Sequence, residues 1–82
     1  MEAHYEGHYI QVSAVPLPKN RWRCLAAVHW DDGREGHLKL LRCDEREFDT
    51  EEDGVRVAFD VALGWIKDGK PEPFTWPTTD WR

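Results

Sequence analysis

The chain has 82 residues, 33% of them charged, and its formal net charge is −5. A chain of this length forms one domain, and it buries too little surface to have more than a thin margin of stability. The negative charge disfavours tight, non-specific binding of nucleic acid, because that affinity comes from neutralised phosphates.

The sequence carries no signal for export or membrane insertion. No N-terminal apolar run resembles a signal peptide, and no segment is apolar enough to cross a membrane. We therefore expect a cytoplasmic protein without a membrane partner. The two cysteines, Cys24 and Cys43, are too few for a disulfide scaffold, so we expect free thiols in a reducing compartment.

Three strands are predicted in the first half of the chain, at 9–15, 21–30 and about 34–42. The first alternates between apolar and polar residues, as a half-buried strand does. Pro16 is expected to end it, because proline has no N–H to donate to a sheet. Every even position of the second strand is apolar, which predicts that the even face packs in the core and the odd face points away from it.

The turn between the second and third strands sets which residues share a face. A two-residue loop would place Lys39 opposite Ala26, within the apolar set. A three-residue loop over 31–33 instead places Ala26 opposite Leu38, and it puts Gly33 where the backbone must be left-handed. The three-residue loop is therefore predicted, which places residue 39 on the odd face.

A helix is predicted from about residue 50 to residue 66. Asp49 or Thr50 is a suitable N-cap, and the acidic run 51–53 suits the positive end of the helix dipole. One apolar stripe follows, at Val55, Ala58, Phe59, Ala62, Leu63 and Ile66. The predicted fold is α+β: a three-stranded antiparallel meander with one C-terminal helix on one face, forming a single domain over residues 1–70.

Residues 71–82 form a tail with three prolines and the aromatic residues Phe74, Trp76 and Trp81. Such proline density is incompatible with more helix, yet disordered segments are poor in aromatic residues. We expect an extended arm that docks on the odd face of the sheet or on a second subunit. The alternative is a flexible end.

Neither the acidic residues nor the histidines predict a chemical site. Seven of the ten residues 44–53 are acidic, but they lack the ligand spacing of a calcium loop. We interpret them as a helix cap, or alternatively as a surface for a basic partner. The four histidines are His4, His8, His29 and His37, and no set of three or four zinc ligands is evident. Because catalytic motifs are also absent, we expect no enzyme activity, cofactor or metal.

The odd face of the sheet is the predicted site of partner binding. It combines aromatic, aliphatic and basic residues without an acidic member from the strand interiors, and a contiguous apolar patch there would mark an interaction surface. The tail could contribute to the same contact, or it could cover this face within one chain. The predicted partner-binding residues are Tyr9, Arg23, Leu25, His29, His37 and Lys39, with Trp76 and Trp81 from the tail.

The pattern resembles two DNA-binding families. Three strands and a helix, with Trp22 in the second strand, the junction 48–52 and the helix segment 58–62, are similar to plant AP2/ERF domains and phage integrase arm-binding domains. They are also similar to small uncharacterised bacterial proteins. The resemblance implies a βββα fold, and it implies DNA contacts by Arg23, His29, Arg34 and Lys39.

Two functional hypotheses follow. The first is a non-enzymatic interaction module that binds a protein partner or a second copy of itself through the odd face and the aromatic arm. The alternative is a nucleic-acid-binding domain that uses the same face.

Overall fold

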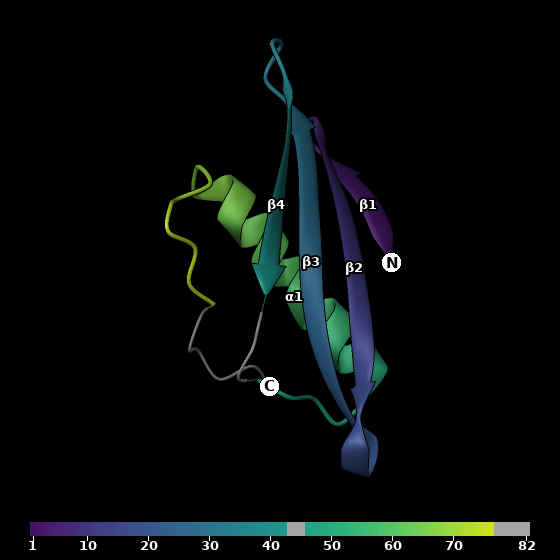
Figure 1. Cartoon of the computed structure of the whole chain (residues 1–82). Helices are drawn as coiled ribbons and strands as arrows, with labels where there is room; N and C mark the ends of the chain where they lie inside the picture. The colour runs from purple at the N-terminus through teal and green to yellow at the C-terminus, as the bar shows by residue number, and fades with distance from the viewer. Residues whose placement is uncertain (43–45, 77–82) are drawn as a thin grey trace.

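An antiparallel sheet with one helix across one of its faces forms the described part of the chain, residues 1–42 and 46–76 of this computed structural model (Figure 1). The strands are β1 (Glu2–Tyr5), β2 (His8–Leu17), β3 (Arg21–Asp31) and β4 (Gly36–Arg42), in the order β1-β2-β3-β4, and the helix is α1 (Glu51–Lys67). The α+β class and the single helix on one face are confirmed. The prediction of three strands is wrong, because β1 adds a fourth.

The missing strand is β1, a short strand joined to β2 by a two-residue turn. Glu6 and Gly7 both have positive φ, 46° and 78°, as the tightest type of hairpin turn requires. The usual sequence signal for this turn is Asn-Gly or Asp-Gly, and glutamate in the first position hides it. Met1 extends the pairing, since the Val12 amide donates to the Met1 carbonyl at 2.8 Å.

β2 continues through Pro16, where the sequence predicted a break. The Val12 amide points toward β1, and residues of the same parity, including Pro16, point to that same edge. β1 pairs only with residues 8–11 and therefore does not reach Pro16. The missing N–H of Pro16 costs no hydrogen bond there, which is how edge strands accommodate proline. The chain turns instead at Pro18–Asn20.

The core lies between α1 and the even face of β2 and β3. Thr50 is the N-cap, and its side-chain oxygen accepts a hydrogen bond from the Asp53 amide at 3.1 Å, which confirms one of the two predicted caps. The buried stripe of α1 is rotated from the predicted one, so that Val55, Phe59 and Leu63 are only half-buried. Its buried members are Gly54, Val57, Ala58, Val61, Ala62, Trp65 and Ile66.

Gly54 lies at a close approach of α1 to the sheet. A methyl group on its Cα would lie 3.2 Å from Cδ2 of Phe48 and 3.6 Å from Cβ of Cys24. Phe48 is itself fixed by a pair of backbone hydrogen bonds with Trp22, at 2.8 and 2.9 Å. The helix start therefore contains a glycine because the sheet and Phe48 occupy the space a side chain would need.

The pairing of β3 with β4 differs from the predicted register. Ala26 lies opposite Leu41, which is 0% exposed, while Leu38 and Leu40 are 58% and 48% exposed on the other face. The connection is longer than three residues because two aspartates hold it: Asp31 accepts from the Gly33 amide at 2.7 Å, and Asp32 accepts from the amides of residues 34 and 35. Ala26 lies opposite Leu41 and not Leu38, which is a shift of three residues. A shift by an odd number of residues exchanges the two faces of a strand, so the side chains of β4 face the opposite way from the prediction.

The described part of the tail, residues 71–76, lies on the helix side of the molecule. Pro71 accepts a hydrogen bond from Nε1 of Trp65 at 3.0 Å, and Glu72 forms an ion pair with Lys39 at 2.8 Å. Phe74 and Trp76 pack against the core cluster. The described tail therefore does not cover the face opposite the helix, and the predicted contact of Trp81 lies outside the described residues.

The two helix glycines provide a matched test of the close approach at Gly54. No atom lies within 4 Å of a methyl group placed on Gly64, so Gly64→Ala should raise the free energy of unfolding by roughly 0.5–1 kcal/mol through helix propensity. Gly54→Ala should show no such gain, and Gly54→Val should lower the free energy of unfolding by about 2 kcal/mol through overpacking. Urea titration followed by tryptophan fluorescence measures all three. An equal gain from both alanine variants would contradict the packing described for Gly54.

Candidate interaction surface

The face of the sheet opposite α1, hereafter the outer face, gathers residues from all four strands (Figure 1). Directly opposed residues share a face, so the observed registers define its members without ambiguity. Tyr9 pairs with His29, Gln11 with Ala27, and Ala27 in turn with Leu40. The outer face consists of Glu2, His4, Tyr9, Gln11, Ser13, Val15, Arg23, Leu25, Ala27, His29, Leu38, Leu40 and Arg42.

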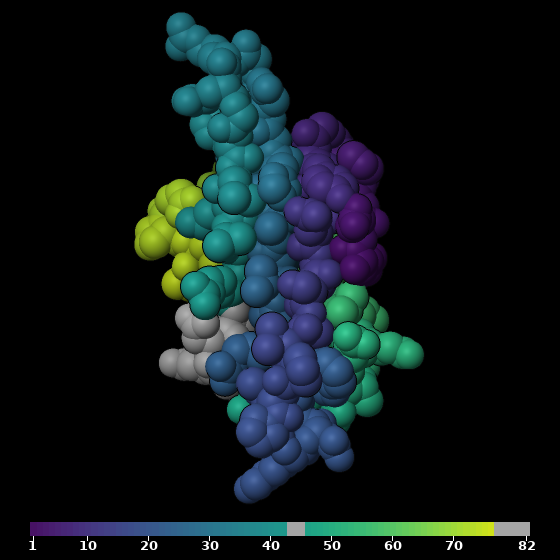
Figure 2. All heavy atoms as spheres, turned by 45° about the vertical axis from the view of Figure 1, so that its right-hand side comes forward, coloured from purple at the N-terminus to yellow at the C-terminus, as the bar shows by residue number. Residues whose placement is uncertain are grey.

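The centre of the outer face toward β4 is apolar. Leu38 and Leu40 lie on one side of the same strand and are the two most exposed leucines, at 58% and 48%. Leu40 is paired with Ala27, and Leu25 lies one position further along that side of β3, half-buried. We call Leu25, Ala27, Leu38 and Leu40 the apolar patch. In Figure 2 the strands occupy the front of the molecule, and the described tail residues, drawn in yellow, lie beside β4 and not over the strands.

An aromatic and imidazole group borders the apolar patch at one end. The ring of Tyr9 lies between two histidines, with centroid distances of 4.9 Å to His4 and 5.7 Å to His29. His29 Nε2 donates to Gln11 Oε1 at 2.9 Å, and the Tyr9 hydroxyl donates to the Glu2 carboxylate. That hydrogen bond to Glu2, with smaller contributions from desolvation and the charge of Glu2, raises the pKa of Tyr9. This end of the outer face therefore presents aromatic and imidazole rings together with polar groups.

Arginine side chains border the apolar patch at the other end. Arg23 lies 3.8 Å from the Glu47 carboxylate, and Arg21 pairs with both Glu47 and Asp49. These contacts use part of the acidic run that the sequence analysis assigned to helix capping. The positive charge at this end is partly neutralised within the chain.

Four of the predicted partner-binding residues are brought together here, and the others are not. Tyr9, Arg23, Leu25 and His29 share the outer face, as predicted. The prediction that His37 and Lys39 join them is wrong, since both lie on the helix side, opposite Trp30 and Val28.

The helix side suits both misplaced residues. The His37 ring stacks on Trp30 at 5.1 Å, and its Nε2 donates to Asp32 at 2.8 Å. Lys39 lays its aliphatic stem along the apolar side and keeps its ammonium at Glu72, so its burial is tolerated. Trp76 packs against the core and not on the outer face.

The sequence analysis missed Leu38, Leu40 and Arg42 as members of the outer face because it assigned β4 the opposite parity. Two consecutive aspartates before a glycine were an available signal, since aspartate side chains hydrogen-bond to backbone amides two residues ahead and stabilise longer turns. The exposed leucines follow from that turn and from no property of the leucines themselves.

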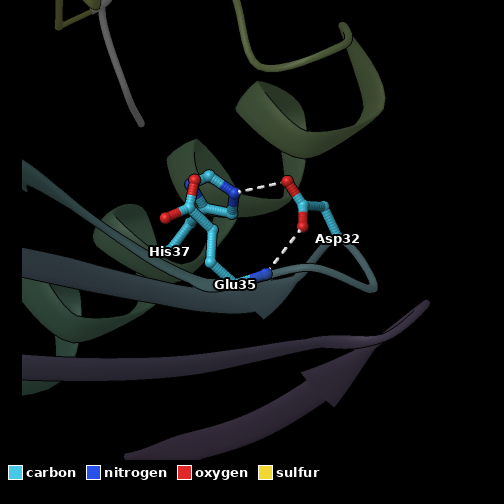
Figure 3. Close-up of side chains that lie close together, drawn as sticks. All are labelled: Asp32, Glu35 and His37. Carbon is cyan, nitrogen blue, oxygen red and sulfur yellow. Dashed lines mark hydrogen bonds and ion pairs between the residues drawn. The ribbon is translucent and has the colours of Figure 1, made fainter.

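The β3–β4 turn also holds a possible set of metal ligands, shown in Figure 3. Asp32, Glu35 and His37 place one ligand atom each within 4.8 Å of one another. Carboxylate and imidazole groups are suitable ligands for a divalent ion. However, the Asp32 carboxylate already accepts from His37 and from two backbone amides, so the cluster is accounted for as the brace of the turn.

No family model, no curated protein and no solved structure matches this chain. The resemblance to AP2/ERF and integrase arm-binding domains therefore stays a prediction. Within the described residues, no helix is both long and apolar enough to cross a membrane.

Asp32 should make the stability of the protein depend on pH in the acid range. The hydrogen bond from His37, followed by those from two backbone amides, lowers the pKa of Asp32 from 3.8 to about 2. A depressed folded-state pKa stabilises the protein above pH 3.8, and this contribution is lost as the pH falls to about 2. At pH 7, Asp32→Asn should therefore unfold at a lower urea concentration than the wild type. Near pH 2, where the Asp32 carboxylate is becoming protonated in the folded protein, the two should unfold at similar urea concentrations. A difference between the two that persists unchanged at the acid end would contradict this role.

Proposed function

We propose that this chain is a non-enzymatic interaction module that binds a protein partner through the outer face. The observation that carries the proposal is the apolar patch, two of whose members are about half exposed, while the aromatic residues of the described tail pack on the core instead. Single exposed leucines need no explanation, but a contiguous group bordered by polar residues is typical of a binding surface.

The composition of the outer face supports a protein as the partner. Interfaces between proteins combine an apolar centre with aromatic and arginine residues around it, and Tyr9, Arg23 and Arg42 surround the patch in this way. Burying Leu38 and Leu40 completely would each contribute about 1 kcal/mol, since roughly half of each side chain is already covered. This gain would favour association without making the isolated chain insoluble.

Nucleic acid is the alternative ligand for the same face, and the structure weakens the case for it. Lys39, one of the residues assigned to DNA contacts, lies on the helix side and pairs with Glu72. Arg23 has a carboxylate of its own chain nearby, and the net charge of the chain is −5. Phosphate binding depends on positive charges that are not neutralised within the chain, and the outer face has few of them.

The proposal predicts that polar substitutions in the apolar patch abolish partner binding without unfolding the protein. A partner isolated with the wild-type chain would be purified, and its affinity measured by titration calorimetry. The double variant Leu38→Asp, Leu40→Asp should bind at least about tenfold more weakly, because the buried carboxylates would be desolvated. Leu25→Gln should weaken binding by a smaller factor.

Asn20→Asp is the matched control, since it adds negative charge at the exposed turn before β3, whereas Leu38 and Leu40 pair with residues toward the far end of that strand. It should bind the partner as the wild type does. Unchanged binding by the double variant and by Leu25→Gln would overturn the proposal. Salt-sensitive retention of a DNA duplex or single strand, lost in Arg23→Ala, would favour the nucleic-acid alternative instead.

A further inference from the structure

We infer that the free edge of β4 pairs with β4 of a second copy of this chain, in an antiparallel arrangement about a two-fold axis at Lys39. The inference deepens the proposed function and rests on it in part, because Leu38 and Leu40 belong both to the apolar patch and to this edge.

The hydrogen bonds around β3 show which backbone groups of β4 are already used. The Asp32 amide donates to the Glu35 carbonyl, and Trp22 exchanges two hydrogen bonds with Phe48 on the same side of β3. In an antiparallel ladder such bonded pairs recur at every second residue. His37, Lys39 and Leu41 therefore bond to β3, and the amides and carbonyls of Leu38 and Leu40 point to the free edge, as do those of Gly36 and Arg42.

Among the described residues, no backbone hydrogen bond from outside β4 reaches Leu38 or Leu40 on this side of the strand. Backbone amides and carbonyls exposed along a strand edge in this way are a template for a further strand. Charged side chains often block such pairing, but the one lysine inside β4 is paired with Glu72 at 2.8 Å. Among the described residues, this lysine therefore does not bring an unpaired charge to the edge.

The sequence of β4 is self-complementary about Lys39. The two leucines whose backbone groups face the edge stand one residue before and one residue after it. A two-fold axis at this residue places Leu38 of one copy opposite Leu40 of the other, and it places Gly36 opposite Arg42. Four leucines then meet on the outer face, and a methyl group placed on Gly36 meets no atom within 4 Å, which leaves room for the arginine.

The axis also brings the two Lys39 residues opposite each other, where like charges would destabilise the pair. Each ammonium lies on the helix side and is neutralised by Glu72 of its own chain. The self-complementary leucines and the neutralised lysine together favour a second copy over an unrelated strand. The result is one continuous sheet with both helices on the same side.

The opposite edge of the sheet is unsuited to the same contact. β1 is four residues long, and the N-terminal ammonium donates to the Val12 carbonyl beside it. Beyond β1, Pro16 presents no N–H to that edge. In the part of the sheet that the structure describes, the β4 edge at Leu38 and Leu40 is therefore the better suited of the two to pair with another strand.

Hydrogen exchange measured residue by residue at low and high protein concentration tests the pairing in the wild-type chain. The amides of His37, Lys39 and Leu41 should be protected at both concentrations, because β3 holds them. The amides of Leu38 and Leu40 should be unprotected at low concentration, and their exchange should slow at least about tenfold at high concentration. Sedimentation should show the mass doubling over the same range.

Leu40→Pro removes a donor from the free edge without removing a bond to β3, so it should stay folded and remain monomeric at every concentration. Ala14→Pro is the matched control, since it places proline on the opposite free edge of the sheet, and it should form dimers as the wild type does. Leu25→Gln should also form dimers, because Leu25 lies on the outer face and away from the edge.

The outcomes separate this inference from the proposed function. A strictly monomeric wild-type chain overturns the inference and leaves binding of another partner by the outer face intact. A dimer in which the Leu38 and Leu40 amides exchange freely also overturns it, since the contact would then be made by side chains of the outer face alone. Dimerisation through protected edge amides, combined with a protein partner whose binding is unchanged by Leu25→Gln and by the double variant Leu38→Asp, Leu40→Asp, supports the inference and overturns the proposed function.

Discussion

The carboxylate of Asp32 determines which side chains of β4 face the helix. It accepts hydrogen bonds from two backbone amides and from His37, and with Asp31 it holds the four residues between β3 and β4 in one arrangement. The period of a strand is two, so a different loop length of the wrong parity would exchange every inward and outward residue of β4. The turn over residues 32–35 therefore places Leu41 in the core and Leu38 and Leu40 on the outer face.

The same parity distributes charge between the two sides of the sheet. Lys39 is directed to the helix side, where Glu72 from the C-terminal segment meets it, and the segment is thereby held beside β4. The outer face loses one positive charge and gains two leucines. A face that the sequence suggested could bind phosphates is thus mainly apolar at its centre, with arginine at one end and imidazole rings at the other.

Much of the fold could be predicted from local patterns, and the remainder depended on contacts between distant residues. Alternation in residues 9–15 and 21–30 identified β2 and β3 and their buried side, and the acidic run after Thr50 located the start of α1. The rotation of the helix stripe could not be predicted, because it depends on how Gly54 fits against the sheet at Cys24, which is remote in sequence, and against Phe48. β1 was missed because its turn uses glutamate in a conformation that asparagine or glycine normally adopts.

Of the residues predicted to bind a partner, those on β2 and β3 lie on the predicted face of the sheet and those on β4 do not. Tyr9, Arg23, Leu25 and His29 depend only on alternation within their own strands. His37 and Lys39 depend also on a loop whose length is set by side-chain hydrogen bonds, which spacing alone does not reveal. A lysine next to the apolar residues is unfavourable when its charge is unpaired. Lys39 is acceptable there because its side chain has a long aliphatic stem and its ammonium pairs with Glu72, which is distant in sequence.

Pro16 has a consequence for the size of any assembly built from this sheet. A sheet with two open edges can add subunits at both ends and grow into a fibre, whereas a sheet with one open edge stops after a single addition. Proline in β2, together with the short β1, makes the β1 side of the described sheet unsuited to such addition. The proposed pairing through β4 would therefore give a closed pair with two-fold symmetry and not a fibre.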